Sequence, residues 1–214
     1  MKSDFVLIDE RFNGAALSTE WSVADTSAAG SPTKEMHADG YHLAFDAEVE
    51  AQNLCLYFGD VLSLGVELVK SVEFIIAMDA ATKDTTTTLA FGIGSARNDT
   101  TDSIAVNAML KIVSTSTDLA LVAETDDGTT DTDDKATGKS LGTALQKCKI
   151  DFRAGLGDVR FFVDGQPVCT DTTFDMSAAT GNVQPFVQIQ KTSDSNTNGV
   201  KVRRVIVEAF EEVS

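Results

Sequence analysis

The residues best suited to bind a metal ion lie in the stretch Asp194-Ser195-Asn196-Thr197-Asn198-Gly199. Oxygen atoms at alternate positions of such a D-x-N-x-N-G sequence can converge on a hard cation such as calcium. A helix–loop–helix calcium site is excluded, because its twelfth position requires a glutamate and Val205 stands there in a strand-like run. Two interpretations are left: a looser calcium site that uses Asp194, Asn196 and Asn198, and a plain Asn/Gly turn.

A second group consists of three acids at alternate positions, Asp46, Glu48 and Glu50. On one face of a strand, neighbouring members would lie about 7 Å apart. This spacing is within the roughly 6.5–9.5 Å that separates the two carboxyl groups of an inverting glycosidase. A solvated strand face or a turn has the same alternation, and we favour that interpretation over catalysis.

The most acidic part of the chain is the run Glu124–Asp134, which holds six acids in eleven residues. Like charges at this density repel one another, so the run predicts a mobile, solvated loop. Calcium binding by the same run is the alternative, because clustered carboxylates need a counter-ion.

The overall charge limits the kinds of partner that the chain can have. Seventeen basic and 33 acidic residues give a formal net charge of −16 at pH 7. Such a surface repels phosphate backbones and anionic lipid headgroups. We therefore expect neither nucleic acid nor a membrane as partner.

Cysteine usage and the N-terminus suggest synthesis in a reducing compartment without export. Cys55, Cys148 and Cys169 have no C-x-x-C spacing and are expected to be small buried side chains. The only apolar run near the start is Phe5–Ile8. Four residues are too few for the apolar region of a signal peptide, which needs roughly 7–15.

The elements that must position these residues are strands, because apolar residues alternate with polar ones along most of the chain. The pattern predicts one all-β domain over residues 1–214, an antiparallel two-sheet sandwich of about ten to twelve strands with little helix. In the segment Val159–Val163, alternation places Val159, Phe161 and Val163 on one face and Arg160 and Phe162 on the other. The expected strands are Tyr41–Phe45, Asn53–Phe58, Val72–Met78, Leu89–Ile93, Ile104–Val113, Leu119–Ala123, Lys147–Phe152, Val159–Val163, Gln166–Val168, Pro185–Gln190 and Val200–Phe210.

Three stretches resemble the concanavalin A-like lectin/glucanase superfamily of jelly-roll sandwiches, which includes laminin-G-like domains. Phe12-Asn13-Gly14, followed by Leu17 and Trp21, is similar to the entry sequence of these domains, and Val159–Gly165 is similar to their V-x-F-Y-V-D-G hairpin. Val202–Glu208 is similar to their closing strand, which pairs close to the first strand. The resemblance therefore implies a single jelly roll over nearly the whole chain.

The same resemblance bears on activity. The glucanase branch carries an E-x-D-x-x-E or E-x-D-x-E strand motif that supplies its catalytic carboxylates, and this sequence has neither. We therefore expect a protein that is not an enzyme. A sandwich of this kind also hosts lectins and virion domains, so the fold does not choose among functions.

Our leading hypothesis is a structural component of a bacteriophage virion, either a capsid decoration protein or a head or tail fibre domain. Its partners would be other virion proteins or further copies of itself in a homo-oligomer, which would cover the apolar run Phe5–Ile8. It would be assembled into the virion in the host cytoplasm. The alternative is a lectin-like module that binds a glycan, with or without the help of calcium.

Overall fold

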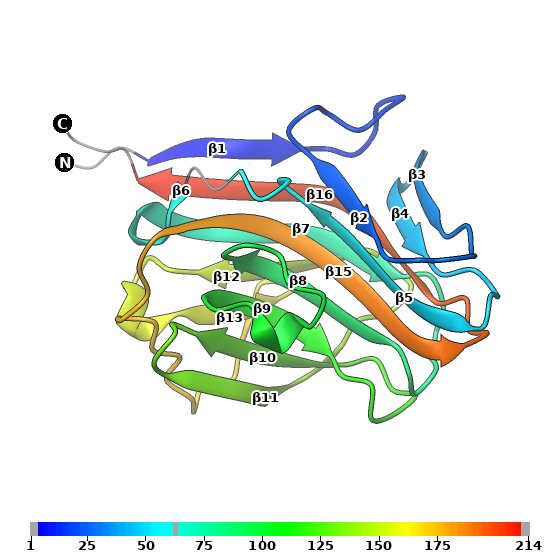
Figure 1. Ribbon diagram of the computed structural model, residues 1–214. Helices are drawn as coiled ribbons and strands as arrows, with labels where there is room; N and C mark the ends of the chain where they lie inside the picture. The colour runs from blue at the N-terminus through cyan, green and yellow to red at the C-terminus, as the bar shows by residue number, and fades with distance from the viewer. Residues whose placement is uncertain (1–3, 62–63, 211–214) are drawn as a thin grey trace.

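Two antiparallel sheets of eight strands each pack face to face, with the second sheet in front of the first in Figure 1. The computed structural model describes residues 4–61 and 64–210. The first sheet runs in the order β14 (Gln166–Val168), β13 (Arg160–Val163), β12 (Gln146–Asp151), β7 (Val69–Met78), β16 (Gly199–Phe210), β4 (Gly40–Ala44), β3 (Thr33–His37), with β1 (Asp4–Glu10) beside β16. The second runs β11 (Asp131–Ser140), β10 (Ala120–Asp126), β9 (Asn107–Ile112), β8 (Thr88–Gly94), β15 (Asn182–Asp194), β5 (Glu50–Tyr57), β2 (Ser22–Asp25), with β6 (Leu64–Gly65) beside β15.

This architecture confirms the predicted all-β, two-sheet antiparallel sandwich with little helix. Within residues 4–61 and 64–210, the helical elements are three short 3-10 turns, η1 (Val66–Leu68), η2 (Thr101–Ser103) and η3 (Leu156–Asp158). In the described part of the chain, none has the length and apolar content that crossing a bilayer requires.

The core between the sheets is built by the alternation that the sequence shows. Val159, Phe161 and Val163 are buried, whereas Arg160 is exposed and Phe162 is half-buried, as predicted. Across the core, the rings of Phe74 in β7 and Phe91 in β8 meet edge to face with centroids 5.4 Å apart. Each such fully buried aromatic side chain contributes about 1.5–3 kcal/mol relative to an exposed one.

The two ends of the chain meet in the first sheet. β1 pairs antiparallel with the second half of β16, so that Asp4 lies opposite Phe210 and Glu10 opposite Val205. The Arg204 guanidinium holds the Asp9 carboxylate with two contacts of 2.6 and 2.8 Å. The structure thus confirms that the closing strand pairs with the first one.

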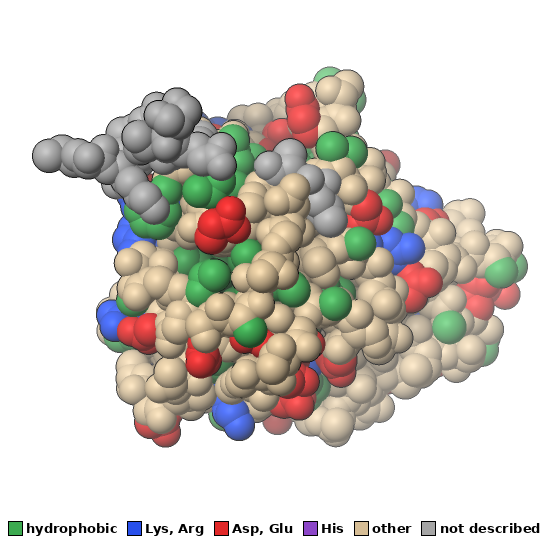
Figure 2. Space-filling view, turned by 60° about the vertical axis from the view of Figure 1, so that its left-hand side comes forward, with side chains coloured by type: hydrophobic (Ala, Val, Ile, Leu, Met, Phe, Trp, Pro, Cys, Tyr) green, Lys and Arg blue, Asp and Glu red, His purple; other side chains and the backbone are tan. Residues whose placement is uncertain are grey.

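β16 does not cover the whole apolar run of β1. The pairing has a bulge between Val6 and Ile8, and both Val6 (56% exposed) and Leu7 (44%) face solvent. Val61, between β5 and β6, is 71% exposed. Figure 2 brings the β1 and β6 side of the molecule forward and shows apolar side chains gathered there around acidic ones.

Two expectations about the strands were wrong. The described residues form sixteen strands instead of about ten to twelve, because short or polar edge strands such as β3 and β11 carry little apolar alternation. The acidic run is a paired hairpin of β10 and β11 and not a mobile loop. Its turn is held by Asp127, whose carboxylate accepts the backbone N–H groups of Thr129, Thr130 and Ala178 at 2.6–3.1 Å.

The central strands of the second sheet are buried on both faces. Its outer face carries a separate apolar cluster of Cys55, Ala90, Met109 and Phe186, and Ile104 packs on this cluster from the connection between β8 and β9. In Figure 1 the short turn η2 of this connection lies in front of the second sheet. We call residues 95–106 the cover segment.

Polar contacts hold the cover segment on the sheet. Asn53 of β5 donates to the backbone carbonyl of Asp99 at 2.7 Å. Gln188 of β15 donates to the carbonyls of Asn98 and Asp99 at 3.1 and 3.2 Å. The cover segment is irregular, so its carbonyl groups are not paired in a helix or sheet. The amide side chains of Asn53 and Gln188 satisfy these carbonyl groups instead.

We predict that Ile104→Ala loosens the cover segment without opening the core. The substitution removes the apolar anchor and should lower the free energy of unfolding by about 2–4 kcal/mol. Under native conditions the Cys55 thiol, which lies beneath Ile104, should then react faster with a thiol reagent, and Cys148 in the core between the sheets is the internal control. Equal acceleration at both cysteines would contradict a local opening.

Candidate functional site

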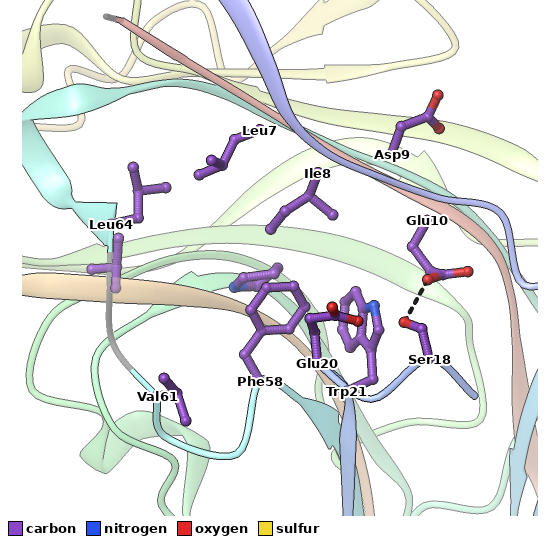
Figure 3. Close-up of a pocket in the computed structure, with 12 residues that line it drawn as sticks. Leu7, Ile8, Asp9, Glu10, Ser18, Glu20, Trp21, Phe58, Val61 and Leu64 are labelled. Carbon is purple, nitrogen blue, oxygen red and sulfur yellow. Dashed lines mark hydrogen bonds between the residues drawn. The ribbon is translucent and has the colours of Figure 1, made fainter. Parts of the chain in front are cut away.

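A cavity of about 310 Å³ opens at the edge of the sandwich between β1 of the first sheet and β6 and β15 of the second. We call it the edge pocket. In Figure 3, Leu7, Leu64 and Val61 lie at one end, the rings of Phe58 and Trp21 in the middle, and Asp9, Glu10 and Ser18 at the other end. The lining residues are Leu7, Ile8, Asp9, Glu10, Ser18, Glu20, Trp21, Phe58, Val61, Leu64, Val183 and Pro185.

The outer face of the second sheet carries a buried ion cluster beside its apolar residues. The ammonium group of Lys111 in β9 contacts the carboxylates of Asp102 at 2.8 Å and Asp134 at 2.9 Å, and it also pairs with Glu124 of β10. Lys111 is 3% exposed and Glu124 is 1% exposed. The register places them on the outer face, because Glu124 lies opposite Met109 and Lys111 opposite Ala90.

Burial shifts the pKa values of the ionisable groups in this cluster. It raises the pKa of Glu124 to about 7, although the Lys111 ammonium opposes the shift. Burial lowers the pKa of Lys111, but its hydrogen bonds to Asp102, Glu124 and Asp134 outweigh this effect and raise the pKa overall. Burial and the nearby charges of Asp133 and Asp126 raise the pKa of Asp131.

Three carboxylates of the acidic run Glu124–Asp134 are close enough to share a cation. One oxygen each of Glu124, Asp131 and Asp133 lies within 4.8 Å of the others. Carboxylates in such a group suit a hard cation. Lys111 already supplies a positive charge to Glu124, so a metal ion would have to compete with the ammonium group.

A polar cleft of about 300 Å³ occupies the same outer face on the other side of the cover segment. Its lining includes one apolar side chain, that of Ala51, and the rest carry hydroxyl, amide, carboxylate or ammonium groups: Thr26, Gln52, Asn53, Thr86, Thr88, Asp99, Ser114, Gln190, Lys191 and Thr192. We call it the polar cleft.

Several of these polar groups are free within the described part of the chain. The side chains of Thr88, Ser114, Gln190 and Thr192 form no hydrogen bond there, and all four are at least partly exposed. Asn53 Oδ1 is buried and has no partner among the described residues. The cleft therefore presents donors and acceptors that a ligand can use.

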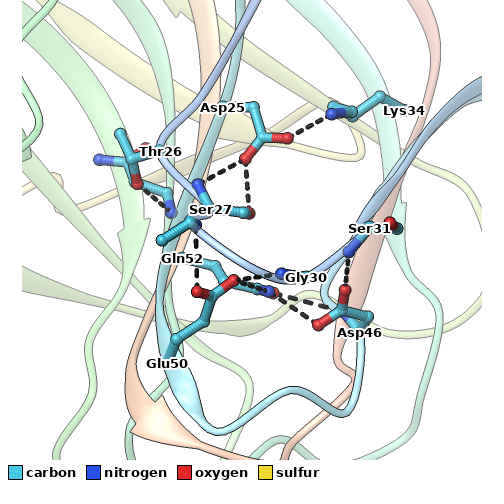
Figure 4. A network of polar contacts seen from close by, with 11 residues as sticks. Asp25, Thr26, Ser27, Gly30, Ser31, Lys34, Asp46, Glu50 and Gln52 are labelled. Carbon is cyan, nitrogen blue, oxygen red and sulfur yellow. Dashed lines mark hydrogen bonds and ion pairs between the residues drawn. The ribbon is translucent and has the colours of Figure 1, made fainter.

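The acids Asp46 and Glu50 hold a loop in place (Figure 4). The Glu50 carboxylate accepts the backbone N–H groups of Ala28, Ala29 and Gly30 at 2.9–3.0 Å, and Asp46 accepts that of Ser31. Gln52 donates to both carboxylates, at 2.7 Å to Asp46 and 3.0 Å to Glu50. These hydrogen bonds, with that of Gln52 first, lower the pKa of Glu50.

This arrangement agrees with the turn that we favoured for Asp46, Glu48 and Glu50 over a catalytic group. A carboxylate whose oxygens accept several backbone N–H groups is stabilised as the anion and is poorly placed to exchange a proton. The two carboxylates thus fix the position of residues 28–31.

The predicted calcium residues lie at the end of β15 and in the loop that follows it, and the structure brings them together with a neighbouring loop. Asn196 donates to Asp194 at 2.5 Å and to the Thr86 hydroxyl at 2.9 Å. Asn198 Oδ1 accepts the backbone N–H of Asp84 at 2.8 Å. These side chains therefore hold the segment between β7 and β8 by hydrogen bonds.

The backbone oxygens of this region surround a lysine that the sequence did not point to. Lys191 Nζ donates to the carbonyls of Asp46, Glu48, Asp194 and Asn196 at 2.8–3.2 Å, and it lies 5.6 Å from the centre of the Phe45 ring. A ring of four carbonyl oxygens suits a cation, and the ammonium group fills that role here. The calcium site at Asp194, Asn196 and Asn198 stays a prediction, with Lys191 as a resident cation beside it.

Comparisons with known proteins bear on the fold. No protein-family model matches the chain, and no curated protein matches its sequence. Among solved structures, a laminarinase from Flavobacterium sp. UMI-01 is 12% identical over 97% of this chain and 100% of its own, with a TM-score of 0.66. The potassium-bound carbohydrate recognition domain of Emp46p is 9% identical over 88% of each chain, with a TM-score of 0.56.

A third similar structure comes from a phage. A conserved carbohydrate esterase, vb_24B_21 from the Shiga toxin-encoding bacteriophage phi24B, is 13% identical over 98% of this chain and 100% of its own, with a TM-score of 0.55. Together with the two sheets and the pairing of β1 with β16, these similarities define the class. The chain has the concanavalin A-like lectin/glucanase jelly-roll fold.

The expectation that the chain is not an enzyme was wrong. It rested on a missing glucanase strand motif, whereas the similarity of fold covers 100% of a laminarinase and 98% of a glycosidic hydrolase. The structure also places a carboxyl group with a raised pKa, that of Glu124, beside two other carboxylates. A motif search misses such a group because its members come from two strands.

We predict that Glu124 makes stability fall as the pH rises from about 4.5 to 7. The folded state holds this proton more tightly than the unfolded state, so the unfolded state loses it first and gains stability over that window. Unfolding free energies of wild type and Glu124→Gln, measured in urea at several pH values, should diverge by up to about 3 kcal/mol. A difference between them that is constant with pH would contradict the raised pKa.

We also predict that Lys191→Met destabilises the protein and that potassium partly rescues it. The methionine keeps the apolar stem but leaves four carbonyl oxygens without their donor, which should cost about 2–4 kcal/mol. Thermal unfolding in potassium chloride should recover more stability than in tetramethylammonium chloride, whose cation is too large for the ring. Lys139→Met, at an exposed position of β11, is the matched control and should change little.

Proposed function

We propose that this protein binds a neutral carbohydrate in the polar cleft of the second sheet. The observation that carries the proposal is the lining of this cleft, in which hydroxyl and amide side chains stand free on a face of the sandwich. The fold supports it, because a carbohydrate recognition domain and a laminarinase share it.

The chemistry of the lining matches that of a sugar. Every sugar hydroxyl both donates and accepts a hydrogen bond, and so do the hydroxyls of Thr88, Ser114 and Thr192, while the Gln190 amide offers both functions side by side. Asn53 Oδ1 adds a buried acceptor without a partner among the described residues. Leaving such an acceptor unpaired lowers stability, and a donor on the ligand would remove this penalty. The charge of −16 disfavours anionic sugars.

Hydrolysis of a glycan at the ion cluster, on the other side of the cover segment from the polar cleft, is the second candidate function. The specific observation is the Glu124 carboxyl, whose pKa is raised to about 7 while Asp131 and Asp133 lie within 4.8 Å. A glycosidase uses a carboxyl group of raised pKa as the acid, beside a second carboxyl group that acts as base or nucleophile.

The virion hypothesis remains a proposal about context. The similar fold of a phage carbohydrate esterase supports it, and a glycan-binding protein in a phage fibre would satisfy both the lectin-like and the virion hypotheses. Assembly with other virion proteins or with further copies of the chain, location in the virion, and calcium at Asp194, Asn196 and Asn198 belong to this proposal.

Glycan binding is tested by titrating the protein with laminarin oligosaccharides and other neutral glycans. Calorimetry measures the affinity, and amide NMR shifts locate the site. Wild type should bind, and Gln190→Ala and Ser114→Ala should each weaken binding about three- to tenfold by removing one hydrogen-bonding group. Gln166→Ala, an exposed strand glutamine in β14, is the matched control. If the amide chemical shifts of β5, β8 and β15 do not change on glycan binding, the assignment of the cleft is contradicted.

The same samples test the second candidate function. New reducing ends should accumulate when laminarin is incubated with wild type and should be reduced at least a hundredfold with Glu124→Gln, since removal of a general acid or base costs about 10²–10⁴ in rate. Equal release by both proteins would exclude Glu124 as the catalytic group.

A further inference from the structure

The edge pocket is polarised along its length. Leu7 and Val61, both exposed, and Leu64 form the apolar end, and Glu10 and Ser18 form the polar end (Figure 3). A ligand that fills it must pair an apolar body with a polar head. This requirement differs from that of the polar cleft, where hydroxyl and amide groups line nearly the whole surface.

The polar end carries uncompensated negative charge. Glu10 accepts a hydrogen bond from the Ser18 hydroxyl at 2.8 Å, and neither Glu10 nor Glu20 has an ion-pair partner in the part of the chain that the structure describes. The third acid, Asp9, is neutralised by Arg204 and also lies 3.6 Å from Arg11. The two glutamates are therefore the groups available to a cationic head.

Aromatic rings lie between the two ends. Trp21 and Phe58 meet edge to face with centroids 4.6 Å apart, and Glu20 lines the same pocket. The face of an indole attracts cations through its quadrupole, more strongly than the faces of the other aromatic rings. Rings beside carboxylates thus favour an ammonium group over a neutral hydroxyl.

We propose that the edge pocket binds a small organic cation, a primary ammonium group on an unbranched apolar stem. The stem lies between Leu7, Val61 and Leu64, and the ammonium group lies between Glu10 and Glu20 beside the Trp21 ring. A cavity of about 310 Å³ holds a ligand of this size. Apolar anions such as fatty acids are excluded by the two glutamates.

The experiment uses Trp21 itself as the reporter, because it is the only tryptophan of the chain. Wild-type protein is titrated with n-hexylammonium chloride while its fluorescence is recorded, and n-hexanol and hexanoate are the probes that share the stem but carry no charge or the opposite charge. Hexylammonium should bind at least tenfold tighter than hexanol, and hexanoate should not bind. Along the ethyl, butyl and hexyl series the dissociation constant should fall about three- to fourfold per methylene.

Charge variants separate the pocket from general attraction to an acidic protein. Glu20→Gln and Glu10→Gln should each raise the dissociation constant of hexylammonium about five- to tenfold, since each removes one charge-assisted contact. Glu48→Gln removes the same charge from an exposed loop position outside the pocket and should leave the constant unchanged. Gln190→Ala, in the polar cleft, should leave it unchanged too.

A further probe identifies the source of the ammonium group. Nα-acetyl-lysine methylamide carries the same head on a peptide, so binding comparable to that of hexylammonium points to a lysine side chain of a partner. Weaker binding points to a free amine. The proposal is overturned if hexanol binds as tightly as hexylammonium, if Glu48→Gln weakens binding as much as Glu20→Gln, or if millimolar hexylammonium leaves the Trp21 fluorescence unchanged.

Discussion

The burial of the central strands of the second sheet on both faces is the constraint on which the rest of the structure depends. Strands β8, β9 and β15 contribute Leu89, Leu110 and Val187 to the core between the sheets, and they also carry the outer cluster around Met109 and Phe186. Apolar side chains on the outer face must be covered, and the cover segment covers them through Ile104. The cover segment divides the outer face into the polar cleft on one side and the ion cluster on the other.

A strongly acidic protein with this architecture must also supply its own positive charge where oxygen atoms gather. Lys83, Lys111 and Lys191 are all nearly fully buried. Lys111 neutralises carboxylates, whereas Lys191 fills a ring of carbonyl oxygens and Lys83 donates to the carbonyl of Ser116 at 2.6 Å. Buried ammonium groups are stable only when paired in this way, so each one fixes the loops that contact it.

The fold is shared with proteins whose names connect them to carbohydrates, at 9–13% identity. At that level the fold persists while the surface chemistry changes, and function has to be argued from the sites. The polar cleft and the edge pocket differ in chemistry, because one presents hydroxyl and amide groups and the other combines an apolar wall with two carboxylates. Each site therefore suits a different class of ligand.

The sequence by itself determined the class of fold, since alternation and the Val159–Gly165 hairpin depend on local periodicity. It missed β3 and β11, because apolar and polar residues alternate too little along them. It predicted a loop for Glu124–Asp134, because it could not show that Lys111 lies beside Glu124. It also pointed to Asp194, Asn196 and Asn198 but not to Lys191, whose role comes from carbonyl groups that carry no sequence signal.

Tertiary structure alone decided where the sites lie. The edge pocket joins side chains of β1, β6 and β15 with those of Trp21 and Phe58, and the polar cleft joins residues from positions 26 to 192. In a sandwich, strands far apart in the chain become neighbours through backbone pairing. Local periodicity can therefore predict the strands, whereas the pairing order of the strands decides which polar groups share a site.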